Sequence, residues 1–213
     1  MKTTIIIAIT LLLNAGASPG KHPSFSYKTY GNLANFFENE NDLLDFFGFK
    51  KGDVVAEVGA LDGQNIAGLA LLTDSISFYA EDIDAKTLNP KHFDKLIARS
   101  RRMKPGMSNT FHLVIGTESS TLLPDKSFDK IFLSITFHEF SQMDEMLDDI
   151  YSKLKSGGKL YILEGHCFNP AHRNYTAEQT ISIVQQHHFT FLKRDGKDLN
   201  NGTGLYREVF IKE

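Results

Sequence analysis

The residues best suited to chemistry lie where a short apolar stretch meets a turn. Residues 54–63 read VVAEVGALDG, an apolar run that contains the acid Glu57 and leads into a turn with Gly59 and Gly63. The polar residues 64–65 then open a second apolar segment. A buried strand, a tight turn and a helix N-terminus in this order form a pocket of the nucleotide-binding type, because free backbone N–H groups converge there.

The rest of the chain predicts the sheet that positions this turn. Predicted strands cover 54–58, 77–80, 111–115, 130–135, 160–163, 189–193 and 205–211, and predicted helices cover 64–73, 86–100, 141–154 and 177–187. The first five strands are mostly near-continuous apolar runs separated by helices, which is typical of a parallel sheet covered on both faces. The last two strands are joined by a glycine-containing loop, which suits an antiparallel hairpin.

Several residues are suited to capping the predicted helices. Asn41-Asp42 can cap a short helix that ends near residue 47, and Ser141 can cap the helix that begins beside it. Gly157 and Gly158 can end that second helix in the glycine-capped manner.

Ligands of open parallel sheets bind at the carboxyl ends of the strands. The polar side chains at or just after those ends are Glu57, Asp82, Thr117 and Ser134. We therefore expect the functional site where these four residues meet.

The composition is that of one folded domain. A chain of 213 residues, 41% hydrophobic and 23% charged, can bury a sizeable core. The net charge of −3 gives no sign of a nucleic-acid surface. Cys167 is the single cysteine, so no internal disulfide can form. The spacing of His138, His166 and His172 matches no familiar ligand set, and we expect no metal.

The first residues resemble a secretory signal peptide. Lys2 precedes an apolar run at 3–13, and small residues follow up to Ala17, where cleavage is expected. The run is shorter than the ~20 residues that a membrane-spanning helix needs. We predict a signal peptide at 1–17, a single domain at 18–213, export to the periplasm or medium, and no stable membrane anchor.

Three motifs, in order and at suitable spacing, identify a family resemblance. They are residues 57–63 (EVGALDG), residues 122–131 (LLPDKSFDKI) before the fourth strand, and residues 154–160 (LKSGGKL) before the fifth. The chain resembles a class I S-adenosylmethionine-dependent methyltransferase over roughly residues 40–165. The resemblance implies an α/β fold, with a Rossmann-like, doubly wound, mostly parallel seven-stranded sheet and an antiparallel C-terminal hairpin.

The resemblance also implies S-adenosylmethionine as cofactor and assigns its methionine end. Gly59, Ala60 and Gly63 would let the backbone approach the methionine part. Glu57 would support that loop or accept a hydrogen bond from the cofactor's amino group. Ser134, near the end of the predicted fourth strand, joins the predicted cofactor-binding set.

At the nucleoside end, the resemblance gives Asp82 the two ribose hydroxyls, with Glu81 as the alternative if the register is shifted by one. A carboxylate suits a cis-diol because its two oxygens accept two hydrogen bonds side by side. Ile83 would lie against the adenine face. Thr117 stands where the family often has an acid at the adenine edge.

The chain departs from the family pattern at two places. Leu61 replaces the middle glycine of the turn, so its side chain must point away from the cofactor or narrow the pocket. Residues 134–139 (SITFHE) stand in place of an Asn-Pro-Pro-Tyr segment. This argues against methylation of the amino groups of adenine, cytosine or glutamine, and leaves O, S, C and small-amine acceptors.

The leading hypothesis is methyl transfer from S-adenosylmethionine to an unidentified small-molecule acceptor. A methyl group on a sulfonium is already activated, so catalysis can be mostly placement. If a base is required, His138 is the candidate, since it follows the fourth strand and titrates near neutrality; a histidine that merely starts a helix is the plain alternative. The competing hypotheses are a non-catalytic cofactor-binding protein and a nicotinamide-dependent oxidoreductase, whose turn usually carries three glycines.

Overall fold

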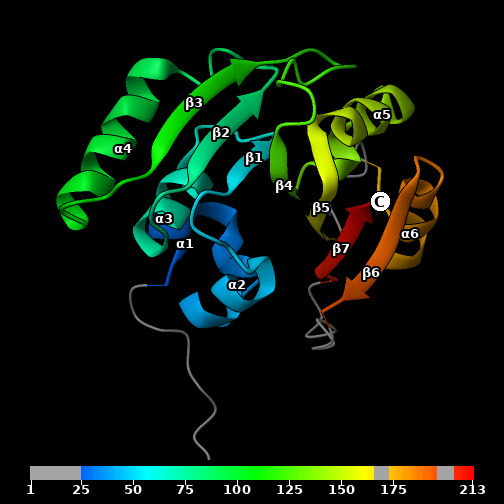
Figure 1. The fold of residues 1–213 in the computed structure, drawn as a ribbon, viewed down its shortest axis with the longest axis horizontal. Coiled ribbons are helices and arrows are strands. Elements are labelled where there is room, and N and C mark those ends of the chain that lie inside the picture. The colour runs from blue at the N-terminus through cyan, green and yellow to red at the C-terminus, as the bar shows by residue number, and fades with distance from the viewer. Residues whose placement is uncertain (1–24, 166–172, 196–203) are drawn as a thin grey trace, which may run out of the picture.

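The computed structural model describes residues 25–165, 173–195 and 204–213. Its centre is a seven-stranded sheet in the order β3-β2-β1-β4-β5-β7-β6 (Figure 1). The strands are β1 (Val54–Val58), β2 (Ser77–Asp82), β3 (Thr110–Ile115), β4 (Phe128–Ser134), β5 (Leu154–Glu164), β6 (Phe189–Arg194) and β7 (Tyr206–Lys212). Neighbours among β1–β5 are parallel, whereas β7 is antiparallel to β5 and β6. The predicted α/β fold with its C-terminal hairpin is confirmed.

Helices cover both faces of the sheet (Figure 1). They are α1 (Tyr27–Tyr30), α2 (Glu40–Phe47), α3 (Gln64–Leu72), α4 (Pro90–Met103), α5 (Met143–Lys153) and α6 (Ala177–Gln185), with 3₁₀ turns η1 (Gly31–Asn35) and η2 (Phe137–Glu139). One core cluster joins α1–α4 to one face, and a second joins α5 and α6 to the other. The strand β1 serves both, because Val55 belongs to the first cluster and Ala56 and Val58 to the second.

The residues just before α3, α4 and α6 are of the types that commonly begin helices. Gly63 precedes α3 with φ +84°, a conformation that only glycine adopts readily. Asn89 caps α4 by accepting a hydrogen bond from the His92 N–H at 3.2 Å. Thr176 and Gln179 cap α6 reciprocally.

The caps predicted at Asn41-Asp42, at Ser141 and at Gly157-Gly158 are wrong. Asn39, rather than Asn41 or Asp42, caps α2 by accepting from two backbone N–H groups. The Ser141 side chain donates to Glu118 instead of capping α5. Helix α5 ends at Lys153, before the glycines, because the backbone turns extended at Leu154 and enters β5 directly.

The sheet therefore brings the ends of β1, β2, β3 and β4 to one edge, as expected from the parallel pattern. The predicted signal peptide lies outside the described residues, as do His166, Cys167 and His172. Within the described part of the chain, no helix combines the length and apolarity needed to cross a membrane.

Candidate functional site

A cavity of about 340 Å³ lies at the carboxyl ends of the strands. We call it the carboxyl-edge cavity. Its described lining comes from the turn after β1, the ends of β2 and β4, the loop after β3, and the start of α5: Val58, Gly59, Leu61, Glu81, Asp82, Ile83, Thr117, Glu118, Ile135, Thr136, Glu139, Phe140, Ser141 and Met146. Four predicted residues, Gly59, Asp82, Ile83 and Thr117, meet here.

The turn after β1 is fastened to the end of β2. The N–H groups of Gly59 and Ala60 both donate to the backbone carbonyl of Glu81, at 2.9 and 2.8 Å. Gly59 has φ +76°, and a Cβ there would lie 2.2 Å from Cγ2 of Thr136. Glycine is therefore required at this position both for the backbone conformation and for the close approach of the loop after β4.

Asp82 is held in place by two backbone amides. It is 8% exposed, and its carboxylate accepts from the Leu61 N–H at 2.8 Å and from the Asp84 N–H at 2.9 Å. An ionised carboxylate can accept about four hydrogen bonds, so two accepting positions are left for a ligand diol. The role predicted for Asp82 is compatible with this geometry.

Leu61 borders the cavity. Its side chain is 54% exposed, and its φ of +50° is in the left-handed region that disfavours branched and bulky residues. The residue that replaces a family glycine thus keeps a glycine-like backbone and adds a side chain to the lining of the cavity.

Ile135, which directly follows β4, also has an unfavourable backbone. Its φ is +58°, which is unusual for a β-branched residue, and its N–H donates to the Leu163 carbonyl at 2.8 Å. Strained residues of this kind cluster at ligand-binding sites, where the surrounding structure holds them.

Glu57 lies beside the cavity in a buried polar network rather than in its lining. Its carboxylate accepts from the side-chain amide of Asn65, which also donates to Oδ1 of Asn32 at 2.7 Å. Ser134 donates to the same Asn32 oxygen at 2.7 Å. Burial raises the pKa of Glu57 to about 8, with Asp62 and Asp82 adding to the rise.

Of the other predicted residues, Ala60 is buried at the turn, and Gly63 backs onto the ring of Phe93. Ser134 is buried and its hydroxyl donates to Asn32, so its side chain is part of the polar network around Glu57. None of the three is in the described lining of the cavity.

His138 is buried between two carboxylates. Its Nδ1 lies 3.0 Å from Glu164, which is itself 1% exposed, and its Nε2 lies 3.1 Å from Glu139. Glu164, followed by Glu139, raises the pKa of His138 against the opposing effect of burial. The imidazole is 6% exposed, and Glu139 stands between it and the carboxyl-edge cavity.

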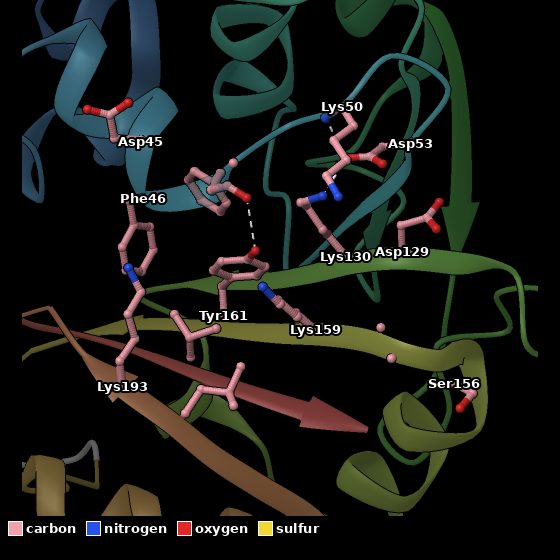
Figure 2. Close-up of a pocket in the computed structure, with 16 residues that line it drawn as sticks. Asp45, Phe46, Lys50, Asp53, Asp129, Lys130, Ser156, Lys159, Tyr161 and Lys193 are labelled. Atoms are coloured by element: carbon pink, nitrogen blue, oxygen red, sulfur yellow. Dashed lines mark hydrogen bonds and ion pairs between the residues drawn. The ribbon is translucent and has the colours of Figure 1, made fainter. Parts of the chain in front are cut away.

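A second cavity, of about 470 Å³, lies at the opposite edge of the sheet (Figure 2). Its charged side chains are largely engaged with the protein itself. Lys130 pairs with Asp53, Asp129 pairs with Lys155 at 2.7 Å, and the Lys193 ammonium lies 5.3 Å from the centre of the Phe46 ring. In Figure 2 the Tyr161 hydroxyl points to the Phe47 carbonyl, a 2.9 Å hydrogen bond. Because ligands of such sheets bind at the carboxyl ends, the smaller cavity is the candidate site.

The methyltransferase-domain family matches residues 56–162, half of the chain, and the protein belongs to that family. No curated protein matches the sequence.

Solved structures share the fold at low sequence identity. A SAM-dependent methyltransferase from Aquifex aeolicus matches with a TM-score of 0.63 and 18% identity, over 91% of this chain and 95% of that one. A TehB-like SAM-dependent methyltransferase from Corynebacterium glutamicum matches with a TM-score of 0.58 and 16% identity, over 80% and 86%. Phosphoethanolamine N-methyltransferase 2 from Haemonchus contortus, in complex with S-adenosyl-L-methionine, gives 0.57 and 15%, over 80% and 51%.

The chain thus belongs to the methyltransferase-domain family, has the class I methyltransferase fold, and takes S-adenosylmethionine as its cofactor. The carboxyl-edge cavity fits that group. The ionisable residues of its described lining are all acids, and Asp82, Glu118 and Glu139 supply negative charge that suits a cofactor whose sulfonium is positive. Glu81 also carries a buried oxygen without a hydrogen-bond partner in the described structure.

Sequence reasoning named Gly59, Asp82, Ile83 and Thr117 but missed other residues of the lining. Glu118, Phe140 and Met146 are among these, and no motif marks them. It also missed the roles of Asn65 and Asn32. The Asn65 amide donates to both Glu57 and Asn32, and these contacts form only when the chain folds.

Proposed function

We propose that this protein transfers the methyl group of S-adenosylmethionine to a small-molecule acceptor. One observation carries the proposal: the glycine turn, Asp82 and Ile83 line the same cavity at the carboxyl edge, in the arrangement that a bound nucleoside needs. The cofactor, once bound, supplies an activated methyl group.

The residues of this chain would act mainly by placement. Asp82 would hold the ribose diol, since its orientation is fixed by the N–H groups of Leu61 and Asp84. Leu61, Ile83 and Phe140 would exclude water from the cavity. Orienting two reactants in this way accounts for much of the rate of such transfers.

For acceptors that must lose a proton, we propose that His138 acts through Glu139. Glu164 keeps the imidazole protonated to a higher pH, and the imidazole holds Glu139, whose carboxylate lines the cavity. Replacing His138 by Gln should then lower turnover with little change in the affinity for S-adenosylhomocysteine. Unchanged turnover would remove His138 from the mechanism.

Calorimetry tests the cofactor site. Wild-type protein should bind S-adenosylmethionine and S-adenosylhomocysteine and should not bind NAD. Asp82→Ala should weaken both by about tenfold or more, because hydrogen bonds to a charged group contribute about 1.5–3 kcal/mol. Asp94→Ala, a change of another acid on α4 outside the cavity lining, is the control. Binding of NAD alone would contradict the proposal.

A second candidate function is a cofactor-binding protein without turnover. The observation that favours it is Leu61, which adds a side chain to the cavity lining at a position where the family has glycine. Binding of both cofactor forms, with no methyl transfer over a broad panel of O, S, C and amine acceptors, would support it.

We also propose that the chain is exported. The support is the leader-like sequence at 1–17, with its lysine, apolar run and small residues. Cell fractionation and mass analysis of the mature N-terminus test this. A chain that begins at Ser18 in the exported fraction is expected, and a full-length chain confined to the cytosol would contradict it.

A further inference from the structure

We propose that two copies of this chain associate through the outer face of α4 and the free edge of β3. This face lies at one end of the sheet, with α4 beside β3 (Figure 1). None of the residues that form it belongs to the described lining of the carboxyl-edge cavity. The association is therefore independent of the cofactor.

A groove of about 470 Å³ runs between α4 and β3. Its apolar walls are Phe93 and Ile97 from the helix and Phe111 and Leu113 from the strand. The ring centres of Phe93 and Phe111 are 6.2 Å apart. The two helix residues are buried, whereas the two strand residues are only partly covered. The strand thus leaves apolar side chains without full cover on this side.

The strand β3 lies at the edge of the sheet and lacks the features that keep an edge unpaired. The N–H groups of Thr110 and Gly116 donate toward β2 at 3.0 and 3.1 Å, so the backbone N–H and C=O groups of the alternate residues between them point outward. Exposed edges of natural sheets usually carry a charged residue, a proline or a bulge. The six residues of β3 include no charged residue or proline, they pair with β2 without a register shift, and Ile115 is 39% exposed. Such an edge is suited to cover by another chain.

The outer face of α4 carries opposite charges at its two ends. Four groove residues are spaced i, i+3, i+4 and i+7 and form one stripe along the helix, which we call the α4 stripe: Asp94, Ile97, Ala98 and Arg101. Asp94 and Arg101 are exposed and lie about 10 Å apart along the helix axis. Within the described part of the chain neither forms an ion pair, and Arg101 only approaches the Phe111 ring, at 5.9 Å from its centre.

The α4 stripe is complementary to itself. A two-fold axis through its centre reverses its direction and places Asp94 opposite Arg101 of the partner subunit, once on each side of the axis. Ala98 lies near that centre, and its small exposed side chain lets the two helices approach closely. Each α4 can then enter the groove beside the β3 of the other copy. An acid and a base at equal distances from the centre point to a second copy as the occupant.

Sedimentation velocity measures the association. Wild-type protein should form a dimer as its concentration rises. Asp94→Arg leaves two arginines in the α4 stripe, and Arg101→Asp leaves two aspartates. Each variant should associate roughly tenfold more weakly or worse, because like charges then face each other at both ends of the stripe. Both residues are exposed, so both variants should keep the wild-type unfolding curve.

A mixture of the two variants tests the two-fold arrangement. One copy of each places arginines opposite aspartates at both ends of the stripe, so the mixture should dimerise although neither variant does so alone. The double variant, with Asp94→Arg and Arg101→Asp in one chain, should likewise recover the wild-type association. A mixture that stays monomeric while wild type dimerises would mean that the copies meet through another face, and would overturn the proposal.

Arg99→Asp is the matched control, since it makes the same change of charge on the same helix. Arg99 is exposed and lines a small cavity beside α1 and α3 rather than the groove. It should leave the association unchanged, and an equal weakening would show an effect of net charge instead of the stripe. Wild-type protein that stays monomeric at every concentration also overturns the proposal. The affinity of Asp94→Arg for S-adenosylhomocysteine should equal that of wild type, so a failure of the proposed function is measured separately.

Discussion

The carboxylate of Asp82 accepts a hydrogen bond from the backbone N–H of Leu61 at 2.8 Å. The residue proposed to hold the ribose is therefore oriented by the same residue that departs from the family's glycine pattern. The contact uses the backbone alone, so the substitution preserves the position of Asp82 and alters only what stands at the mouth of the cavity.

Leu61→Gly is expected to raise the affinity for S-adenosylhomocysteine, because it removes a 54%-exposed side chain from the cavity mouth. The unfolding free energy should stay within about 1 kcal/mol of wild type, since relief of left-handed strain offsets the flexibility of glycine in the unfolded chain. Leu122→Gly is the control: Leu122 has φ +53° and is 58% exposed but is not in the described lining. Weaker binding by Leu61→Gly would mean that the leucine contacts the cofactor.

Stability should fall as the pH rises from about 5 to 8. Burial raises the pKa values of Glu57 and Glu81 from 4.5 to about 8, so the folded protein holds these protons more tightly than the unfolded chain does. Their contribution is fully present below pH 4.5 and is lost as the pH approaches 8. His138, with a pKa raised above 6.5, adds a loss in the same direction.

The variant Glu81→Gln should flatten that pH profile, gaining on the order of a few kcal/mol relative to wild type at pH 8 compared with pH 5. Urea unfolding at the two pH values measures the difference. Glu178→Gln, which removes an exposed acid whose pKa is lowered by Arg194, should not flatten the profile. Parallel curves for wild type and Glu81→Gln would contradict the raised pKa.

The buried pair at the opposite edge of the sheet should matter more for stability than its exposed neighbour. Lys130 and Asp53 are 6% and 7% exposed, and Lys130→Met leaves Asp53 buried without its cation (Figure 2). We expect a loss of about 3–5 kcal/mol in unfolding free energy, largely recovered in the double variant with Asp53→Asn. Lys155→Met breaks a pair whose side chains are 42% and 30% exposed and should cost less than about 1 kcal/mol. Equal losses of unfolding free energy in Lys130→Met and Lys155→Met would contradict the greater weight given to the buried pair.

The environment of His138 can be read by NMR. Glu164 is the main cause of its raised pKa, so Glu164→Gln should move the imidazole titration to lower pH. Glu139→Gln should cause a smaller shift in the same direction, because Glu139 is half exposed and partly screened by water. A larger shift in Glu139→Gln than in Glu164→Gln would contradict the assignment of Glu164 as the main cause of the raised pKa.

Much of the fold follows from local sequence. The strand at Val54–Val58 has the predicted bounds, because a short apolar run between Gly52 and Gly59 can form little else. The apolar run that predicts the second strand likewise places Asp82 at the carboxyl end of that strand. The preceding acid, Glu81, packs against Gly116, and this contact could not be predicted from the sequence because it depends on how β2 and β3 pair.

Helix ends and side-chain partners were harder to predict, because they depend on contacts distant in sequence. Ser141 has the right residue type for a cap, yet its hydroxyl is used by Glu118, 23 positions away. The glycines at 157–158 suggested a helix end, but pairing of Leu154 with Phe128 had already started the fifth strand. The sequence offered His138 as a candidate base but could not show its partner Glu164, 26 positions away.

The link between Asn32 and Ser134 bears on the order in which the molecule is assembled. The Asn32 side-chain amide donates to the backbone carbonyl of Ser134 at 3.1 Å, and the Ser134 hydroxyl donates to Oδ1 of Asn32 at 2.7 Å, so the two bonds join residues 102 positions apart. A nascent chain carries the glycine turn long before the fourth strand emerges from the ribosome. A fragment that stops short of the fourth strand would therefore carry the family's signature while lacking Ser134, the partner that holds Asn32 in place.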